Sequence, residues 1–100
     1  METLLADPAV EAVVQKAKEM LADKLGIEPE TIQLFHLQAR DWPDESLGCP
    51  LSGQNYAQGI TPGYLIELDA GGPVYVFHSD QGTMVRLCGI EPTREIYQPP

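Results

Sequence analysis

The chain has 100 residues, of which 43% are hydrophobic and 21% are charged. This length and apolar content predict one folded domain over residues 1–100, and no apolar run reaches the roughly 20 residues that a membrane-spanning helix needs. Fifteen acidic residues against six Lys and Arg give a net charge of −9. The charge argues against nucleic acid or an anionic membrane as a partner, because both would be repelled.

A helix is predicted over residues 8–25. Asp7 suits the N-cap and Pro8 suits the first helical position, where its missing N–H has no consequence. Gly26 is well placed to end the helix. Apolar residues recur at spacings of three and four, which gives one stripe that faces a core. These residues are Val10, Val13, Val14, Ala17, Leu21 and Leu25. Residues 1–7 carry no basic residue before their short apolar patch, so we expect no signal peptide and a cytoplasmic location.

Alternating apolar and polar residues predict strands in the remaining chain. The first strand is expected over residues 31–40, with Phe35, Leu37 and Ala39 on its apolar side. Three short strands with tight turns follow over residues 63–88 as an antiparallel meander, and residues 89–100 are expected to form an irregular tail. One helix and about four antiparallel strands predict an α+β domain of two layers. In it a curved sheet wraps over the helix, cystatin-like in outline.

A long loop is predicted over residues 42–61, between the first strand and the meander. It contains an aromatic residue, a carboxylate, a hydroxyl, a thiol and prolines, and this composition fits neither a helix nor a strand. Loops of this length in small domains are either functional or held in shape by their own side chains.

The loop and the meander together carry a recognisable pattern. The chain has Trp-Pro-Asp-x-Ser-Leu-Gly-Cys-Pro at 42–50, Thr-Pro-Gly-Tyr-x-Ile-x-Leu at 61–68, Tyr-x-x-His-x-Asp at 75–80 and a cysteine at 88. In this combination the region spanning residues 8–88 resembles a small bacterial domain of uncharacterised proteins. The resemblance implies a helix and a strand ahead of the Trp-Pro-Asp segment, and it implies no established activity. Many members of that group look secreted or lipid-anchored, which would suit a disulfide.

Cys49 and Cys88 leave three interpretations open. A bridge between them would close about 40 residues and would be worth about 4 kcal/mol on the chain-entropy model. Cytosolic thiols normally stay reduced, so the two cysteines can instead be ordinary buried side chains. A reactive or metal-binding pair is the third interpretation.

Catalytic and metal-binding interpretations have weaker support. A nucleophile would pair Cys49 or Ser46 with His78, oriented by Asp44 or Asp80. Ser46 lacks the Gly-x-Ser-x-Gly pattern, however, and no oxyanion hole is recognisable. A zinc site would lack the usual short ligand spacings. Its ligands would be Cys49, Cys88, His36 and His78. We therefore expect no catalytic residue, no cofactor and no metal.

The leading hypothesis is a non-catalytic module that presents the loop of residues 42–61 to a protein or peptide partner. The candidate binding residues are Trp42, Asp44, Ser46, Tyr56, Tyr64 and His78. A small enzyme or redox protein that uses Cys49 with His78 is the competing class. A peptidase inhibitor is a further alternative, which rests on fold-level analogy alone.

The same residues also have a purely architectural interpretation. Trp42 would cover one end of the core, with its indole N–H on a carbonyl. Asp44 and Ser46 would close turns, and His78 would bond to the loop backbone or to Asp80. Two glycines, Gly48 and Gly63, would supply positive φ angles.

Overall fold

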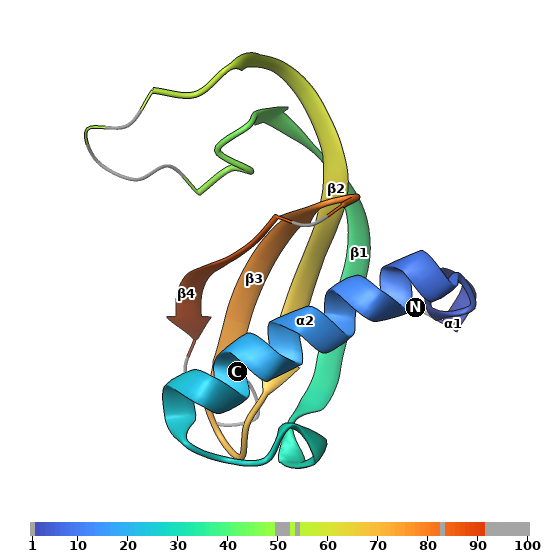
Figure 1. Ribbon diagram of the computed structural model, residues 1–100, viewed down its shortest axis with the longest axis vertical. Helices are drawn as coiled ribbons and strands as arrows, with labels where there is room; N and C mark the ends of the chain where they lie inside the picture. Colours follow the sequence, from blue (N-terminus) through green and yellow to red (C-terminus); the bar gives the residue numbers. More distant parts are fainter. Residues whose placement is uncertain (1, 50–52, 54, 83, 92–100) are drawn as a thin grey trace, which may run out of the picture.

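One long helix crosses one face of a four-stranded antiparallel sheet (Figure 1). The computed structural model describes residues 2–49, 53, 55–82 and 84–91. The helical elements are α1 (Glu2–Leu5), α2 (Pro8–Leu25) and the 3₁₀ turn η1 (Pro29–Thr31). The strands are β1 (Gln33–Asp44), β2 (Gln58–Asp69), β3 (Val74–Asp80) and β4 (Val85–Glu91), which lie side by side in chain order. The predicted α+β architecture of two layers is confirmed. Within the described residues, no helix is both long enough and apolar enough to cross a bilayer.

Local signals set both ends of α2, and its bounds coincide with the range expected from the sequence. The Asp7 carboxylate accepts a hydrogen bond from the Ala9 amide at 2.9 Å, which satisfies one of the free N–H groups of the first turn. At the other end Gly26 adopts a left-handed conformation with φ 69°, and its N–H donates to the Ala22 carbonyl. Helix α1, which the sequence did not predict, precedes this cap.

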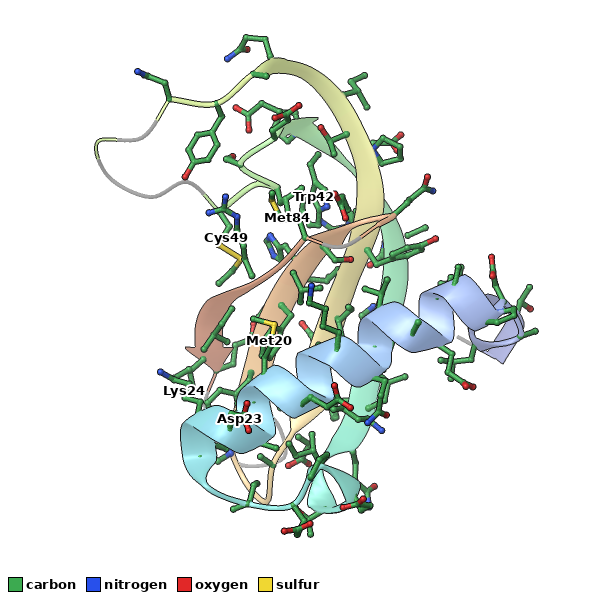
Figure 2. All side chains as sticks on the ribbon, in the orientation of Figure 1. Met20, Asp23, Lys24, Trp42, Cys49 and Met84 are labelled. Carbon is green, nitrogen blue, oxygen red and sulfur yellow. A yellow bond between two sulfur atoms is a disulfide. The ribbon has the colours of Figure 1, made fainter. Side chains whose placement is uncertain are left out.

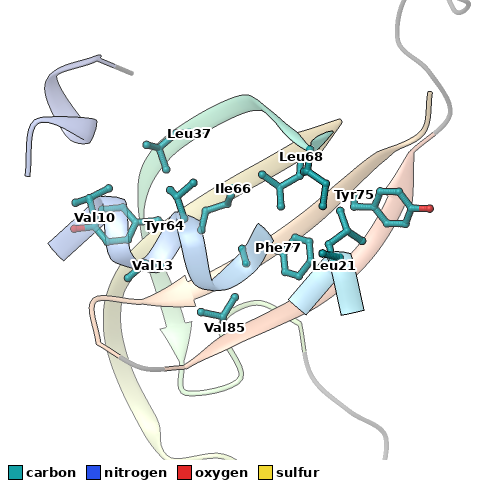
Figure 3. Packing of buried hydrophobic residues seen from close by; sticks show 14 residues of the cluster. Val10, Val13, Leu21, Leu37, Tyr64, Ile66, Leu68, Tyr75, Phe77 and Val85 are labelled. Atoms are coloured by element: carbon teal, nitrogen blue, oxygen red, sulfur yellow. The ribbon is translucent and has the colours of Figure 1, made fainter. Parts of the chain in front are cut away.

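The main core lies between α2 and the sheet. Figure 3 shows Val10 and Leu21 of α2 facing Ile66 of β2 and Phe77 of β3. The core includes the buried residues Val10, Val13, Val14, Ala17, Leu21, Ala22, Ile32, Leu37, Tyr64, Ile66, Leu68, Tyr75, Phe77 and Val85. On β2 these side chains occupy every second position, as expected for a strand with one face on the helix.

A second, smaller cluster covers the opposite face of the sheet. Trp42, Leu47 and Leu65 are buried there, and Val76 packs against them. Leu65 lies between Tyr64 and Ile66 in the sequence, so its side chain points away from α2. We call this side of the sheet the loop face, because the chain that follows β1 folds back over it. Both faces of the central strands therefore carry apolar contacts.

The predicted element boundaries were wrong around the loop. Strand β1 continues to Asp44 rather than ending at residue 40, and β2 begins at Gln58 rather than 63. Trp42 is the partner of Thr61 and Asp41 is the partner of Pro62, so these segments form a two-stranded arm that curves beyond β3 and β4 (Figure 1). The irregular connection is shortened to residues 45–57.

Two further predictions about the strands need correction. The tail was expected from residue 89, but β4 runs to Glu91, and the rest of the predicted tail lies outside the described residues. On β1 only Leu37 of the expected apolar side is buried, whereas Phe35 is 37% exposed. Strand β1 lies at the edge of the sheet, and a bulge between Leu34 and His36 interrupts its alternation.

Candidate functional site

The site is built around Trp42, whose indole reaches across the sheet. Its side chain is 5% exposed, and Nε1 donates a hydrogen bond to the Ser79 carbonyl at 2.8 Å. Trp42 belongs to β1 and Ser79 to β3, so the ring passes over the strand between them, β2. Gly63 of β2 allows the backbones to approach, because a Cβ at this position would lie 1.8 Å from the Ser79 carbonyl oxygen. Gly63 is therefore required for space rather than for the positive φ that we predicted.

His78 stacks on the indole. The two ring centroids lie 4.2 Å apart, with an angle of 15° between the planes. Nδ1 donates a hydrogen bond to the Leu47 carbonyl at 2.7 Å, as in the architectural interpretation in which the imidazole bonds to the loop backbone. Burial lowers the pKa of His78; the Leu47 carbonyl opposes this shift, and the positive charge of Arg40 adds to it. Burial thus favours the neutral ring, and the bond to the Leu47 carbonyl places a proton on Nδ1.

A tight turn after β1 places Leu47 under the indole. The Asp44 carboxylate accepts hydrogen bonds from the Ser46 amide, at 2.9 Å, and from the Ser46 hydroxyl. These two bonds lower the pKa of Asp44, with the hydroxyl contributing most. Leu47 and Gly48 then adopt left-handed conformations, with φ 61° and 70°. The turn buries the Leu47 side chain and directs its carbonyl at His78. A Cβ at Gly48 would lie 2.9 Å from the Trp42 ring.

A disulfide joins Cys49 to Cys88, with 5.7 Å between the two Cα atoms (Figure 2). Of the three interpretations that the sequence left open, the structure shows the bridge. It fastens the start of the loop to β4. While it is intact, Cys49 has no thiolate for nucleophilic attack, and neither sulfur is available to zinc. Over the described residues, no group of three or more His, Cys, Asp or Glu is placed to hold a metal ion.

The far end of the loop is fixed on the same face. The Glu45 amide donates to the Ala57 carbonyl at 3.2 Å, which closes the base of the loop. Tyr56 packs against Arg86 of β4, with 5.3 Å between Cζ of the arginine and the centre of the phenol ring. The loop is therefore tied to the sheet by the Leu47 carbonyl, the disulfide and the Tyr56–Arg86 contact.

The structure brings most of the predicted site residues together, but not all of them. Trp42, Asp44, Ser46 and His78 lie within the turn and stack described above, and Tyr56 lies on the same face. Tyr64 does not join them, because its side chain faces α2 in the main core (Figure 3). Trp42 and Ser46 are buried, so they position the loop and do not offer their own surface to a partner.

Two features, the position of Arg86 and the exposed apolar side chains near the loop and the arm, could not be predicted from the sequence. Arg86 was not singled out, since an arginine in a half-buried strand gives no signal of its own until the strands are placed. The arm and the neighbouring turn also expose apolar side chains: Ile60 is 75% exposed and Met84 is 42% exposed. Ile60 follows Gly59 and lies close to Pro62, in a segment that was predicted to be a loop. The sequence therefore gave no indication that Ile60 belongs to a strand.

A comparison with protein families bears on this site. A family model described as "Domain of unknown function (DUF8738)" matches residues 14–88. The chain belongs to this family. The DUF8738 match begins within α2 and ends at Cys88, so it spans every residue of the site described above. It agrees with the resemblance to an uncharacterised domain that the sequence suggested. Among curated proteins and solved structures, nothing matches this DUF8738 chain.

Proposed function

We propose that this domain is a non-catalytic binding module and that the loop of residues 45–57, on the loop face of the sheet, contacts a protein or peptide partner. The observation that carries the proposal is the fixation of the two described ends of the loop, residues 45–49 and 55–57, by contacts of different kinds. A loop that is ordered before it binds loses less conformational entropy on association. A loop that is fixed in this way can therefore bind a partner with a smaller entropic cost.

The exposed positions of the loop support this proposal. Glu45, Gly53, Asn55 and Ala57 are exposed, whereas Leu47, which carries the left-handed turn, is buried. The loop thus has an inner side that holds its shape and an outer side that is open to a partner. Met84 adds an exposed apolar side chain beside Glu45 and Leu47.

The alternative functions have less support. An enzyme that uses Cys49 with His78 would need a free thiolate, but the sulfur is bonded to Cys88, and His78 uses Nδ1 to hold the Leu47 carbonyl. The peptidase-inhibitor alternative is supported only by the general outline of the fold. No contact on the loop face favours a peptidase over another partner.

The disulfide also bears on the compartment in which the domain works. Structural disulfides persist in oxidising compartments and are rare in the reducing cytosol. The expectation of a cytoplasmic location rested on the composition of residues 1–7, and the bridge points to another compartment. We therefore propose that the domain functions in an oxidising compartment. Rapid alkylation of cells at low pH, followed by mass analysis of the native protein, should recover Cys49 and Cys88 bonded; recovery of two alkylated thiols would contradict this.

Site-specific photo-crosslinking tests the binding function. A photoreactive amino acid is introduced at Asn55 of the loop and, as a matched control, at Asp23 on the exposed side of α2. The variants are expressed in cells that naturally make the chain. We expect a discrete adduct from position 55 that position 23 does not give. If position 55 gives no adduct, or if both positions give the same adducts, the loop is not the binding surface.

A further inference from the structure

Arg86 places a guanidinium on the loop face, where its donors meet few acceptors among the described residues. Nη1 lies 3.5 Å from the Tyr56 hydroxyl, and Nη2 lies 3.9 Å from the Met84 sulfur. Nε is buried and has no hydrogen-bond partner within the described part of the chain. A guanidinium has five N–H donors, and here they meet a distant phenol oxygen and a thioether, both weak acceptors. Buried unsatisfied donors are uncommon in native proteins and call for an explanation.

The position of the guanidinium is fixed although its donors are not satisfied. The Tyr56 ring lies against it, with 5.3 Å between the ring centre and Cζ. In the pairing of β3 with β4, Arg86 is directly opposite His78, so both side chains project from the same face. His78 is in turn held by the Trp42 ring and by the Leu47 carbonyl. Arg86 is thus part of the same arrangement that fixes the loop.

The Lys and Arg side chains of the described residues are divided between the two sides of the sheet. The lysines of the described residues lie on α2, as Lys24 does in Figure 2. The arginines of the described residues are Arg40 and Arg86, and both lie on the loop face. Cζ of Arg40 lies 6.0 Å from the centre of the Trp42 ring, and the charge of Arg40 contributes to the lowered pKa of His78. Two guanidinium groups therefore flank the Trp42–His78 stack.

Two carboxylates of the loop face, those of Asp44 and Asp80, are engaged in their own turns. Asp44 accepts from Ser46, and Asp80 accepts from the amides of Gly82 and Met84. Within the described residues, neither of them bonds to Arg86. An ordered cation whose charge is not neutralised by these carboxylates is suited to an anion that comes from outside the chain.

We propose that Arg86 binds a carboxylate of the partner, which sits beside Tyr56 and His78. The two Nη groups of the planar guanidinium match a carboxylate in a bidentate geometry. A dianionic phosphate fits less well, since one guanidinium next to a phenol and a neutral imidazole would meet two negative charges in a chain of net charge −9. This inference rests on the proposed binding function and gives it a chemical requirement: the partner carries an accessible acidic side chain or a free carboxyl terminus.

NMR titration of the oxidised, ¹⁵N-labelled protein tests the site directly. The probes are N-acetylglutamic acid α-amide for a side chain, N-acetylglycine for a chain terminus and inorganic phosphate, at constant ionic strength and neutral pH. The resonance of the Arg86 Nε–H is followed, because this group is buried at the proposed site. We expect a saturable shift with at least one carboxylate probe, and the probe that binds more tightly identifies the source. Absence of a saturable shift with both, or tighter binding of phosphate, would overturn the proposal.

Matched variants separate a specific contact from the general effect of charge. Arg86→Gln and Lys24→Gln each remove one positive charge, but only the first alters the site. We expect Arg86→Gln to weaken binding of the carboxylate probe by about tenfold or more, and Lys24→Gln to change it by less than about twofold. Arg86→Lys keeps the charge and loses the fork, so it should fall between these values. Equal losses in both glutamine variants would refute a site at Arg86.

The two experiments distinguish the two proposals. If a loop-specific adduct forms but no carboxylate shifts the Arg86 signal, the domain binds its partner without this anchor. If the loop forms no adduct while the carboxylate binds at Arg86, the site is an anion site and the module does not use the loop. The titration of the wild-type protein does not depend on any variant. If Arg86→Gln does not fold, that titration alone still tests the proposal.

Discussion

Removing the bridge between Cys49 and Cys88 should destabilise the domain strongly. The two cysteines are 39 positions apart, and closure of a chain segment of this length lowers the entropy of the unfolded state by about 13 cal/mol/K. The loss is therefore about 4 kcal/mol at 25 °C, a large part of the roughly 5–15 kcal/mol by which small domains are stable. The main core should persist in the variant, because the contacts of α2 with the sheet involve neither sulfur.

Urea unfolding of the double variant Cys49→Ser/Cys88→Ser measures this loss. Far-UV circular dichroism follows the helix, and the fluorescence of Trp42, the single tryptophan, follows the loop face. Wild-type protein unfolded in the presence of a reductant is the matched control, because it separates the effect of the bridge from that of the serine hydroxyls. We expect the transition midpoint to fall in both samples by the same amount.

The result that would refute this reasoning is a loss below about 1 kcal/mol in both samples, far from the value that loop closure gives. Such a result would mean that the unfolded chain is already compact around the loop. Loss of the helical signal in the absence of urea would contradict a second point, namely that the bridge stabilises a core that is already complete without it.

Three further predictions concern the stack and its surroundings. Trp42→Phe keeps a ring beside the imidazole but removes the donor to the Ser79 carbonyl. Urea unfolding should show that the free energy of unfolding falls by about 1–3 kcal/mol. An unchanged midpoint would mean that this hydrogen bond does not contribute to stability. Gly63→Ala should cost about 3 kcal/mol or more, because its Cβ meets backbone that cannot move aside, whereas Gly89→Ala on β4 has open space and should cost far less. If the two alanine variants were equally stable, the close approach of β2 and β3 would be wrong. The pKa of His78 is lowered by folding, so the unfolded chain binds more protons below its usual value of 6.5, and stability falls as the pH drops through that value. Thermal unfolding from about pH 8 to pH 5 should show a smaller fall for His78→Gln, and an equally steep fall would exclude His78 as the cause.

Helix α2 was predictable because its signals are local. A capping aspartate, a proline at the first turn, a regular apolar stripe and a terminal glycine act within the helix itself. The meander was predictable for a similar reason, since Tyr64, Ile66 and Leu68 alternate as a strand with one face on a core does. Together these segments were sufficient for the fold class.

The arm formed by β1 and β2 was not predictable in this way. Pro43 and Pro62 lack the N–H that a ladder uses, and segments that contain proline and glycine are usually assigned to loops. The arm tolerates them because it has only two strands and leaves backbone on both sides unpaired. Its strand character comes from contacts across the sheet, such as Trp42 with Ser79, that no local pattern encodes.

The candidate site was predictable in its residues but not in its arrangement. The motif at 42–50 contains Trp42 and Cys49, and Cys49 forms the disulfide. The turn-forming roles of Asp44 and Ser46 were also predicted. Tyr64 alternates with Ile66 and Leu68, so its position facing α2 follows from the same pattern that predicted the strand. Arg86 became a candidate only when pairing placed it opposite His78.

The central claim is that the described loop residues 45–49 and 55–57 have one conformation on the sheet before any partner binds. Backbone ¹⁵N relaxation of the oxidised protein tests it at Leu47, Gly48, Cys49 and Asn55. We predict order parameters near 0.85 at these positions, as in the strands of a rigid sheet. Values below about 0.6 there, with β2 and β3 remaining rigid, would contradict the claim and remove the physical basis of the proposed binding surface.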